Sequence, residues 1–147
     1  MPANTAPIFT VTPKIAWGTT NPIGTVAVTS TAASAFDGTT SAVLLYTAGS
    51  NGGFVQKIIM DAGGTNATVS VARIFVNNGS TNTTAANNTL LMQYTLPTTT
   101  VSNIASLAHI EIPLMLQLPA SYRIYILISS SANLTGGWYT SVVAGDY

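Results

Sequence analysis

Few side chains in this sequence can take part in acid–base or metal chemistry. The acidic residues are Asp37, Asp61, Glu111 and Asp146, and His109 is the single histidine. Cysteine is absent, which excludes a thiolate nucleophile, a disulfide framework and a cysteine-based zinc site. Serines are abundant, but no Gly-x-Ser-x-Gly segment places one on the nucleophile elbow of a hydrolase. Because so few ionisable groups are available, we predict that the protein is not an enzyme.

His109 and Glu111 are the pair whose spacing comes nearest to a site. They lie two positions apart in a run with the alternation of a β-strand, so both side chains are expected on one face. A metal site would need a third and a fourth ligand, for example from copies of the pair around the axis of a trimer. Asp61 and Glu111 could also pair as the two carboxylates of a glycoside hydrolase, which nothing else in the sequence supports. The alternative is a His–Glu pair on a solvated or interface strand, and we predict neither a metal nor a cofactor.

The composition is unusually poor in charge. Charged residues make up 5% of the 147 residues, hydrophobic residues make up 47%, and neutral polarity comes from 23 Thr, 13 Ser and 11 Asn. Four cations cannot form the basic stripe that nucleic-acid binding requires, so no nucleic-acid partner is expected. No apolar run approaches the ~18 residues of a membrane span, and no secretory signal is recognisable, so no membrane partner is expected. A neutral surface favours association, which predicts a homo-oligomer.

Apolar residues that recur with a period of two predict an all-β protein. The clearest run is residues 109–118, in which Ile and Leu alternate with a face that carries His109, Glu111 and Pro113. The proline argues for an edge strand or a bulge. Residues 54–61 and 67–76 are expected to form a hairpin through the glycine-rich segment 63–66. Further short runs lie at residues 8–12, 25–30, 41–47, 89–96, 121–129 and 138–144. About eight strands at this spacing predict a single jelly-roll-like β-sandwich.

Residues 1–24 are expected to form an extended N-terminal arm, and residues 25–147 the single sandwich domain. Four of the seven prolines lie in this arm, where they favour extended backbone and remove hydrogen-bond donors. The arm also carries large apolar side chains that a small sandwich has little room to bury, namely Ile8, Phe9, Val11, Ile15 and Trp17. We predict that these side chains contact a partner. The alternative is that the arm forms the first edge strand of its own sheet.

Several short segments along the chain are distinctive in sequence and in their order. They are PANTAPIF at 2–9, KI at 57–58, ARIFVNNGS at 72–80, NTLL at 88–91, LPASYR at 118–123 and the closing stretch from Trp138 to Gly145-Asp146-Tyr147. In these segments the chain resembles small jelly-roll structural proteins of tailed-bacteriophage particles, especially the capsid decoration, or cement, type. The likeness spans nearly the whole chain and includes no catalytic signature. It implies trimers seated on a capsid lattice, without enzymatic activity or cofactor.

The resemblance therefore implies a decoration protein that binds the outer surface of a phage head and stabilises the shell. Its partner would be the major capsid protein. Its location would be the surface of the virion, after synthesis in the bacterial host cytoplasm. The alternative is a carbohydrate- or receptor-binding β-sandwich module of a phage tail or fibre, for which exposed Trp and Tyr would form a stacking platform. The copy number per particle separates the two, because it is high for a head protein and low for a receptor binder.

Overall fold

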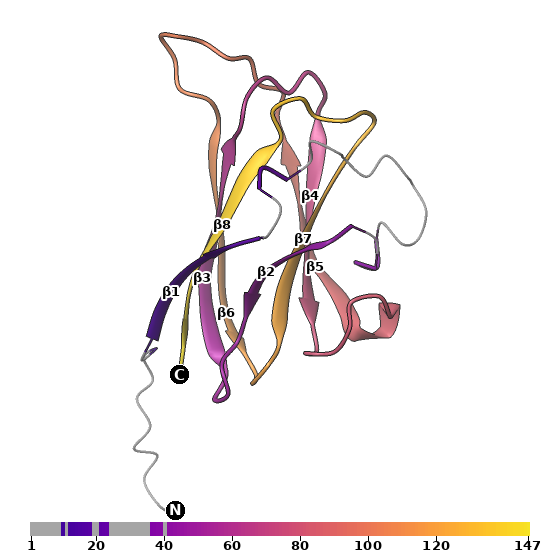
Figure 1. The fold of residues 1–147 in the computed structure, drawn as a ribbon, viewed down its shortest axis with the longest axis vertical. Helices are drawn as coiled ribbons and strands as arrows, with labels where there is room; N and C mark the ends of the chain where they lie inside the picture. The colour runs from indigo at the N-terminus through magenta and orange to yellow at the C-terminus, as the bar shows by residue number, and fades with distance from the viewer. Residues whose placement is uncertain (1–9, 11, 19–20, 24–35, 40) are drawn as a thin grey trace, which may run out of the picture.

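Eight β-strands and one short 3-10 helix are the regular elements in the part of the chain that the computed structural model describes, residues 10, 12–18, 21–23, 36–39 and 41–147. The strands form two antiparallel sheets that face each other (Figure 1). The first sheet has the strand order β1-β8-β3-β6 and the second has the order β2-β7-β4-β5. The strands are β1 (Thr12–Trp17), β2 (Val43–Thr47), β3 (Gly53–Ala62), β4 (Ser70–Asn77), β5 (Asn88–Leu96), β6 (His109–Leu118), β7 (Arg123–Ser130) and β8 (Trp138–Asp146).

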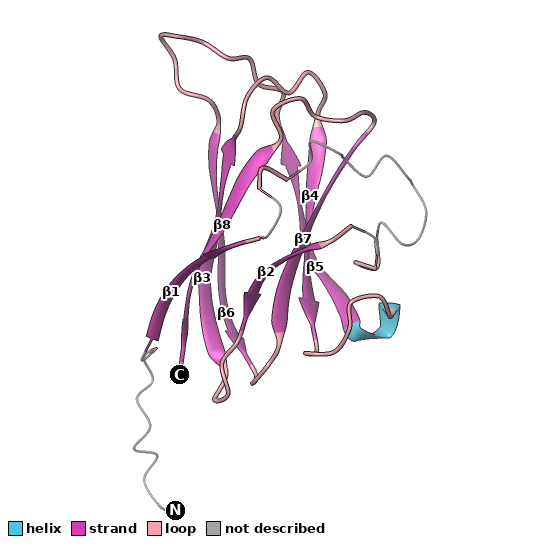
Figure 2. Ribbon diagram, in the orientation of Figure 1, coloured by secondary structure: helices cyan, strands magenta, loops and turns pink. Residues whose placement is uncertain are grey.

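Among the eight described strands, nearly every connection leads from one sheet to the other. Of these strands only β4 and β5 follow each other within one sheet, and they are joined through the 3-10 turn Ala85–Asn87 that Figure 2 shows in cyan. This strand order is that of a jelly roll, in which two Greek keys fold into facing sheets. The predicted fold class, an all-β jelly-roll-like sandwich of about eight strands, is therefore confirmed.

The hairpin predicted for residues 54–61 and 67–76 is wrong. These segments form β3 and β4, which belong to different sheets, and β3 pairs with β6 and β8 instead. The glycines between them serve close packing rather than a hairpin turn. A Cβ atom on Gly63 would lie 2.4 Å from the carbonyl oxygen of Gly136, and one on Gly64 would lie 3.1 Å from its Cα. Only glycine lets the two connections approach so closely.

Strand β6 has the bounds and the alternation that the sequence predicts. Ile112 and Leu118 are buried, whereas His109, Glu111 and Pro113 are exposed. The strand lies at the edge of the first sheet, and its pairing with β3 is irregular next to Pro113. Both consequences of the proline, an edge strand and a bulge, are therefore confirmed.

The core lies between the two sheets, and β7 is buried along most of its length. Its isoleucines face the first sheet, whereas Tyr125 and Leu127 pack with Phe75 on the opposite side of the second sheet. Residues 36–39 pack against part of that opposite side, where Phe36 lies against Arg73. A Cβ atom on Gly38 would lie 3.1 Å from the ring of Phe75. The second sheet is therefore buried on both faces over β7 and β4, while the first sheet keeps a more open outer face.

Residues 12–17, within the segment predicted as an arm, form the edge strand β1. They pair with β8 in an unbroken register from Thr12 opposite Asp146 to Trp17 opposite Ser141. The predicted strand at 25–30 and most of the one at 8–12 lie outside the described residues. For residues 1–9 the arm stays a prediction.

One end of the sandwich is closed by hydrogen bonds between loops, centred on the fully buried Asn66. Its Oδ1 accepts hydrogen bonds from the backbone N–H groups of Gly136 at 3.1 Å and Gly137 at 2.9 Å. Its Nδ2 donates to the carbonyl of Gly137 at 3.0 Å, and its backbone pairs with Thr99. These bonds join the β3–β4, β5–β6 and β7–β8 connections.

Candidate interaction surface

The outer face of the first sheet, which is turned away from the second sheet, carries those predicted contact residues that the structure describes. The register places Ile15 beside Val143 and Trp17 beside Ser141 on this face. Ile15 is 69% exposed and Trp17 is 65% exposed, because β1 is an edge strand and both side chains point away from the core. The other predicted contact residues lie outside the described residues: Ile8, Phe9 and Val11.

Two further large apolar side chains are exposed on the same face. Tyr139 on β8 is 49% exposed and Met115 on β6 is 65% exposed. Half-buried apolar residues of the central strands lie between the two edges, among them Val143 and Ile59. The outer face of the first sheet is therefore apolar over β1 and β8 and mixed over β3 and β6.

A row of charged side chains crosses β3 and β6 on this face. Asp61 Oδ1 lies 2.6 Å from His109 Nδ1, and His109 Nε2 lies 3.8 Å from Glu111 Oε1. Glu111 Oε1 also accepts a hydrogen bond from Lys57 Nζ at 2.6 Å. The hydrogen bond with Asp61 raises the pKa of His109 above its ordinary value of 6.5, and the bond from Lys57 lowers the pKa of Glu111. Within the described residues, no group of three His, Asp or Glu side chains is arranged to hold a metal ion.

The structure thus places the His109–Glu111 pair on an exposed strand face and adds Asp61 to it. Asp61 and His109 are opposite each other in the β3–β6 register, although 48 positions separate them in the chain. The carboxylate of Asp61 is within hydrogen-bond distance of the histidine, and that of Glu111 lies 3.8 Å from its other ring nitrogen and accepts a hydrogen bond from Lys57. The arrangement is a network of ion pairs that neutralise one another.

Asp146 connects the two sheets at the opposite end of the sandwich from Asn66. Its Oδ1 accepts hydrogen bonds from the Tyr46 hydroxyl at 2.6 Å and from the backbone N–H of Gly49 at 3.2 Å. Its Oδ2 accepts a hydrogen bond from Lys14 on β1. Burial raises the pKa of Asp146, but the bonds from Lys14 and Tyr46 outweigh it, so that the pKa lies below 3.8. The role of this carboxylate is to hold β1, β2 and β8 together.

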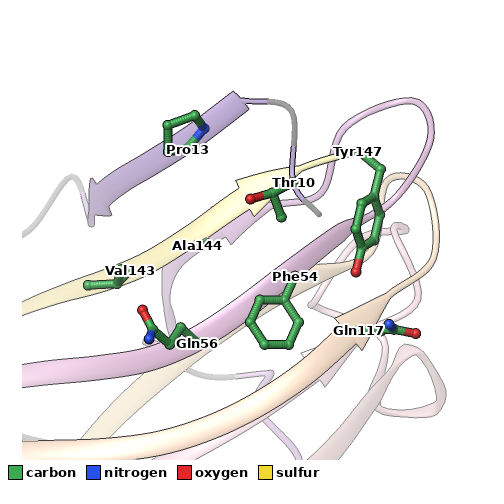
Figure 3. Close-up of a pocket in the computed structure, with 8 residues that line it drawn as sticks. All are labelled: Thr10, Pro13, Phe54, Gln56, Gln117, Val143, Ala144 and Tyr147. Carbon is green, nitrogen blue, oxygen red and sulfur yellow. The ribbon is translucent and has the colours of Figure 1, made fainter. Parts of the chain in front are cut away.

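A shallow pocket of about 470 Å³ opens on the outer face of the first sheet, near the start of β1 (Figure 3). Its aromatic walls are Phe54 and Tyr147, and its polar walls include the amides of Gln56 and Gln117. Val143, which lies beside Ile15, also lines it, so the pocket adjoins the exposed part of β1. The lining contains no charged side chain.

A β-bulge in β3 builds one wall of this pocket. Val55 pairs with Ala144 and Lys57 pairs with Val143, so β3 advances by two residues while β8 advances by one. Because of this extra residue, Gln56 and Lys57 both point to the outer face, whereas in a regular strand one of them would point into the core. The bulge therefore places Gln56 and Lys57 next to each other on the outer face.

The sequence alone does not reveal this pocket or the Asp61–His109 contact. Each depends on which strands are neighbours and on their register, and the residues involved lie far apart in the chain. The glutamine that follows Phe54-Val55 is a polar residue in an apolar run, and it is the one local signal of the bulge.

The chain matches no family model, no curated protein and no solved structure. None of the helices in the described residues is long and apolar enough to cross a membrane. The acidic groups lie in separate places: Asp37 binds Thr39, Asp146 binds Tyr46, and Asp61 and Glu111 flank a histidine. The outer face of the first sheet presents apolar side chains and neutral amides beside the paired charges of β3 and β6.

Proposed function

We infer that this chain is a structural protein of a bacteriophage particle, a decoration protein that binds the outer surface of the head and stabilises the shell. The observation that supports this most directly is the exposure of Ile15 and Trp17, two large apolar neighbours on one edge strand. Burial of such a side chain is worth about 1.5–3 kcal/mol, so a partner that covers β1 gains several kcal/mol from these two residues.

The proposal assigns the major capsid protein as the partner and a homotrimer as the assembled form. The low charge of the chain supports both, because little repulsion opposes close packing. On the outer face of the first sheet, Lys57 is paired with Glu111 and Asp61 is paired with His109, so these charges are already neutralised within the chain. Attachment should then depend on apolar and neutral polar contacts.

The first experiment is a count of copies in purified particles of the phage that encodes the chain, by quantitative mass spectrometry. A decoration protein is expected in numbers comparable to the major capsid protein, and a copy number typical of a tail tip would contradict the proposal. The same particles should retain the protein when sodium chloride is raised from about 0.1 to 1 M, where the Debye length falls to about 3 Å.

The second experiment tests the surface itself, with shells that lack the protein and purified variants added back. The double variant Ile15→Ser/Trp17→Ser is expected to bind at least tenfold more weakly, since the burial of two large side chains is worth about 3–6 kcal/mol. Val101→Ser/Ile104→Ser is the matched control, because these side chains are 58% and 97% exposed in the β5–β6 connection. Full occupancy by the first double variant would show that β1 is not the contact.

A further inference from the structure

We propose that the pocket on the outer face of the first sheet binds a neutral saccharide. The proposal goes beyond shell binding, because neither Ile15 nor Trp17 lines the pocket, although Pro13 of the same strand does. The volume of about 470 Å³ is within the range of small-molecule sites, about 300–1,000 Å³. The ligand class follows from the chemistry of the lining, which combines aromatic rings with amide groups.

The charge of the surroundings selects a neutral ligand. Lys57, which follows the bulge residue Gln56, is bound to Glu111 at 2.6 Å. Asp146, which precedes Tyr147, is bound by Lys14 and Tyr46. A phosphate or a carboxylate placed in the pocket would lose hydration without gaining a counter-ion, which is unfavourable.

The amides favour a saccharide over an apolar side chain of a protein. Gln56 and Gln117 are both exposed, and each amide has two N–H donors and a carbonyl acceptor. An apolar group that covered them would remove water and leave these atoms without partners, at about 1–3 kcal/mol for each unsatisfied group. Sugar hydroxyls both donate and accept hydrogen bonds, so they can pair with the N–H donors and with the carbonyl acceptor of an amide. The C–H faces of a pyranose ring pack on aromatic rings such as that of Phe54.

The walls of the pocket are held by the fold before any ligand arrives. Phe54 lies on a central strand between Gln117 of β6 and Gly145 of β8. Gly145 has no side chain, and the side chain of Thr10 packs over it, because a Cβ atom on Gly145 would lie 2.6 Å from Thr10 Oγ1. The backbone N–H of Tyr147 donates to the carbonyl of Gly52 at 3.3 Å. A site whose rings are already positioned loses less conformational entropy on binding than a flexible one.

The test is a titration of the ¹⁵N-labelled full chain, followed by NMR, with the methyl pyranosides of glucose, galactose and mannose and with maltose and cellobiose. Concentrations up to about 20 mM detect dissociation constants in the millimolar range. At least one of these sugars is expected to shift the side-chain amide signals of Gln56 and Gln117 and the backbone signal of Phe54. Glucuronate, which carries a charge, is expected to leave the three signals unchanged.

Two variants complete the experiment. Gln117→Ala removes an exposed amide, Phe54→Leu removes the ring but keeps an apolar side chain, and each should weaken binding of the responding sugar at least tenfold. The matched controls are Asn133→Ala, which removes an exposed amide in another loop, and Tyr94→Leu, which removes an aromatic ring that is 41% exposed on β5. Both control variants should bind the sugar as tightly as the unaltered chain does. The proposal is overturned if no neutral sugar shifts these signals, or if both pocket variants bind unchanged. It is also overturned if a synthetic peptide of residues 1–9 shifts them and the sugars do not, which would assign the pocket to a protein segment.

Discussion

Asn66→Ala removes the side chain that joins the β3–β4 and β7–β8 connections at one end of the sandwich, and it should destabilise the fold while leaving the outer face of the first sheet intact. The side chain makes three hydrogen bonds, all with the backbone of Gly136 and Gly137. A hydrogen bond contributes about 0.5–1.5 kcal/mol net, so the loss of three amounts to about 1.5–4.5 kcal/mol. Gly137 is buried, and its N–H group would be left without an acceptor, which favours the upper part of this range.

The assays are urea unfolding and thermal unfolding, each followed by circular dichroism and by tryptophan fluorescence, in which the fully buried Trp138 reports on the same end of the sandwich. For a chain of this size, 1 kcal/mol corresponds to about 2–4 °C in the melting temperature, so the variant should melt about 3–18 °C lower. Asn133→Ala is the control, because this residue lies in the same β7–β8 connection but is exposed. Its effect should stay within about 0.5 kcal/mol.

Two results would refute this reasoning about Asn66. One is an Asn66→Ala variant whose free energy of unfolding lies within about 0.5 kcal/mol of the unaltered chain, the size of an ordinary surface effect. The other is an Asn133→Ala variant that is equally destabilised, which would mean that the connection is sensitive to any change and that the buried amide has no special part.

Two predictions concern pH. Because the pKa of Asp146 is lower in the folded chain than its ordinary 3.8, the stability it contributes is present above that value and is lost as the pH falls through the folded pKa. Asp146→Asn should therefore lower the urea midpoint at pH 7, and the midpoint of the variant should fall less steeply than that of the unaltered chain as the pH is lowered to 3. If the midpoints of both chains fell equally steeply, the roles of Lys14 and Tyr46 would be contradicted. The pKa of His109 is raised, so its contribution is present below pH 6.5 and is lost as the pH rises through the folded pKa. An NMR titration should place its midpoint above 6.5, and Asp61→Asn should move it downward; a midpoint that does not move would show that Asp61 is not the main cause.

Much of the fold follows from local patterns in the sequence. The alternation in residues 109–118 predicts β6 with its exact bounds, and Pro113 predicts its place at an edge, because a residue without an N–H donor is tolerated there. The pairing of strands does not follow in the same way. Glycines at 63 and 64 are as suitable for a close approach to Gly136 as for a hairpin turn, and only the complete topology distinguishes the two.

The sequence predicts only part of the candidate surface. Ile15 and Trp17 are recognisable as large apolar residues in a proline-rich stretch, and both are exposed on β1. The pocket depends on the β3 bulge, which places Gln56 and Lys57 on one face, and on the presence of Gln117 on the neighbouring strand. Neither can be derived from residue types, since a shift of one residue in register would turn every side chain to the other face.

The central position of β8 in the first sheet has a consequence for how the chain folds during its synthesis. β8 lies between β1 and β3, yet it is translated after the other seven strands. Until residues 138–146 have been synthesised, β1 has no partner and one edge of β3 is open, whereas the chain already contains all four strands of the second sheet. The second sheet is able to form first. The first sheet is complete only when residues 138–146 have inserted between β1 and β3. A chain interrupted before this segment would expose both edges to other nascent chains, which is the situation in which β proteins aggregate.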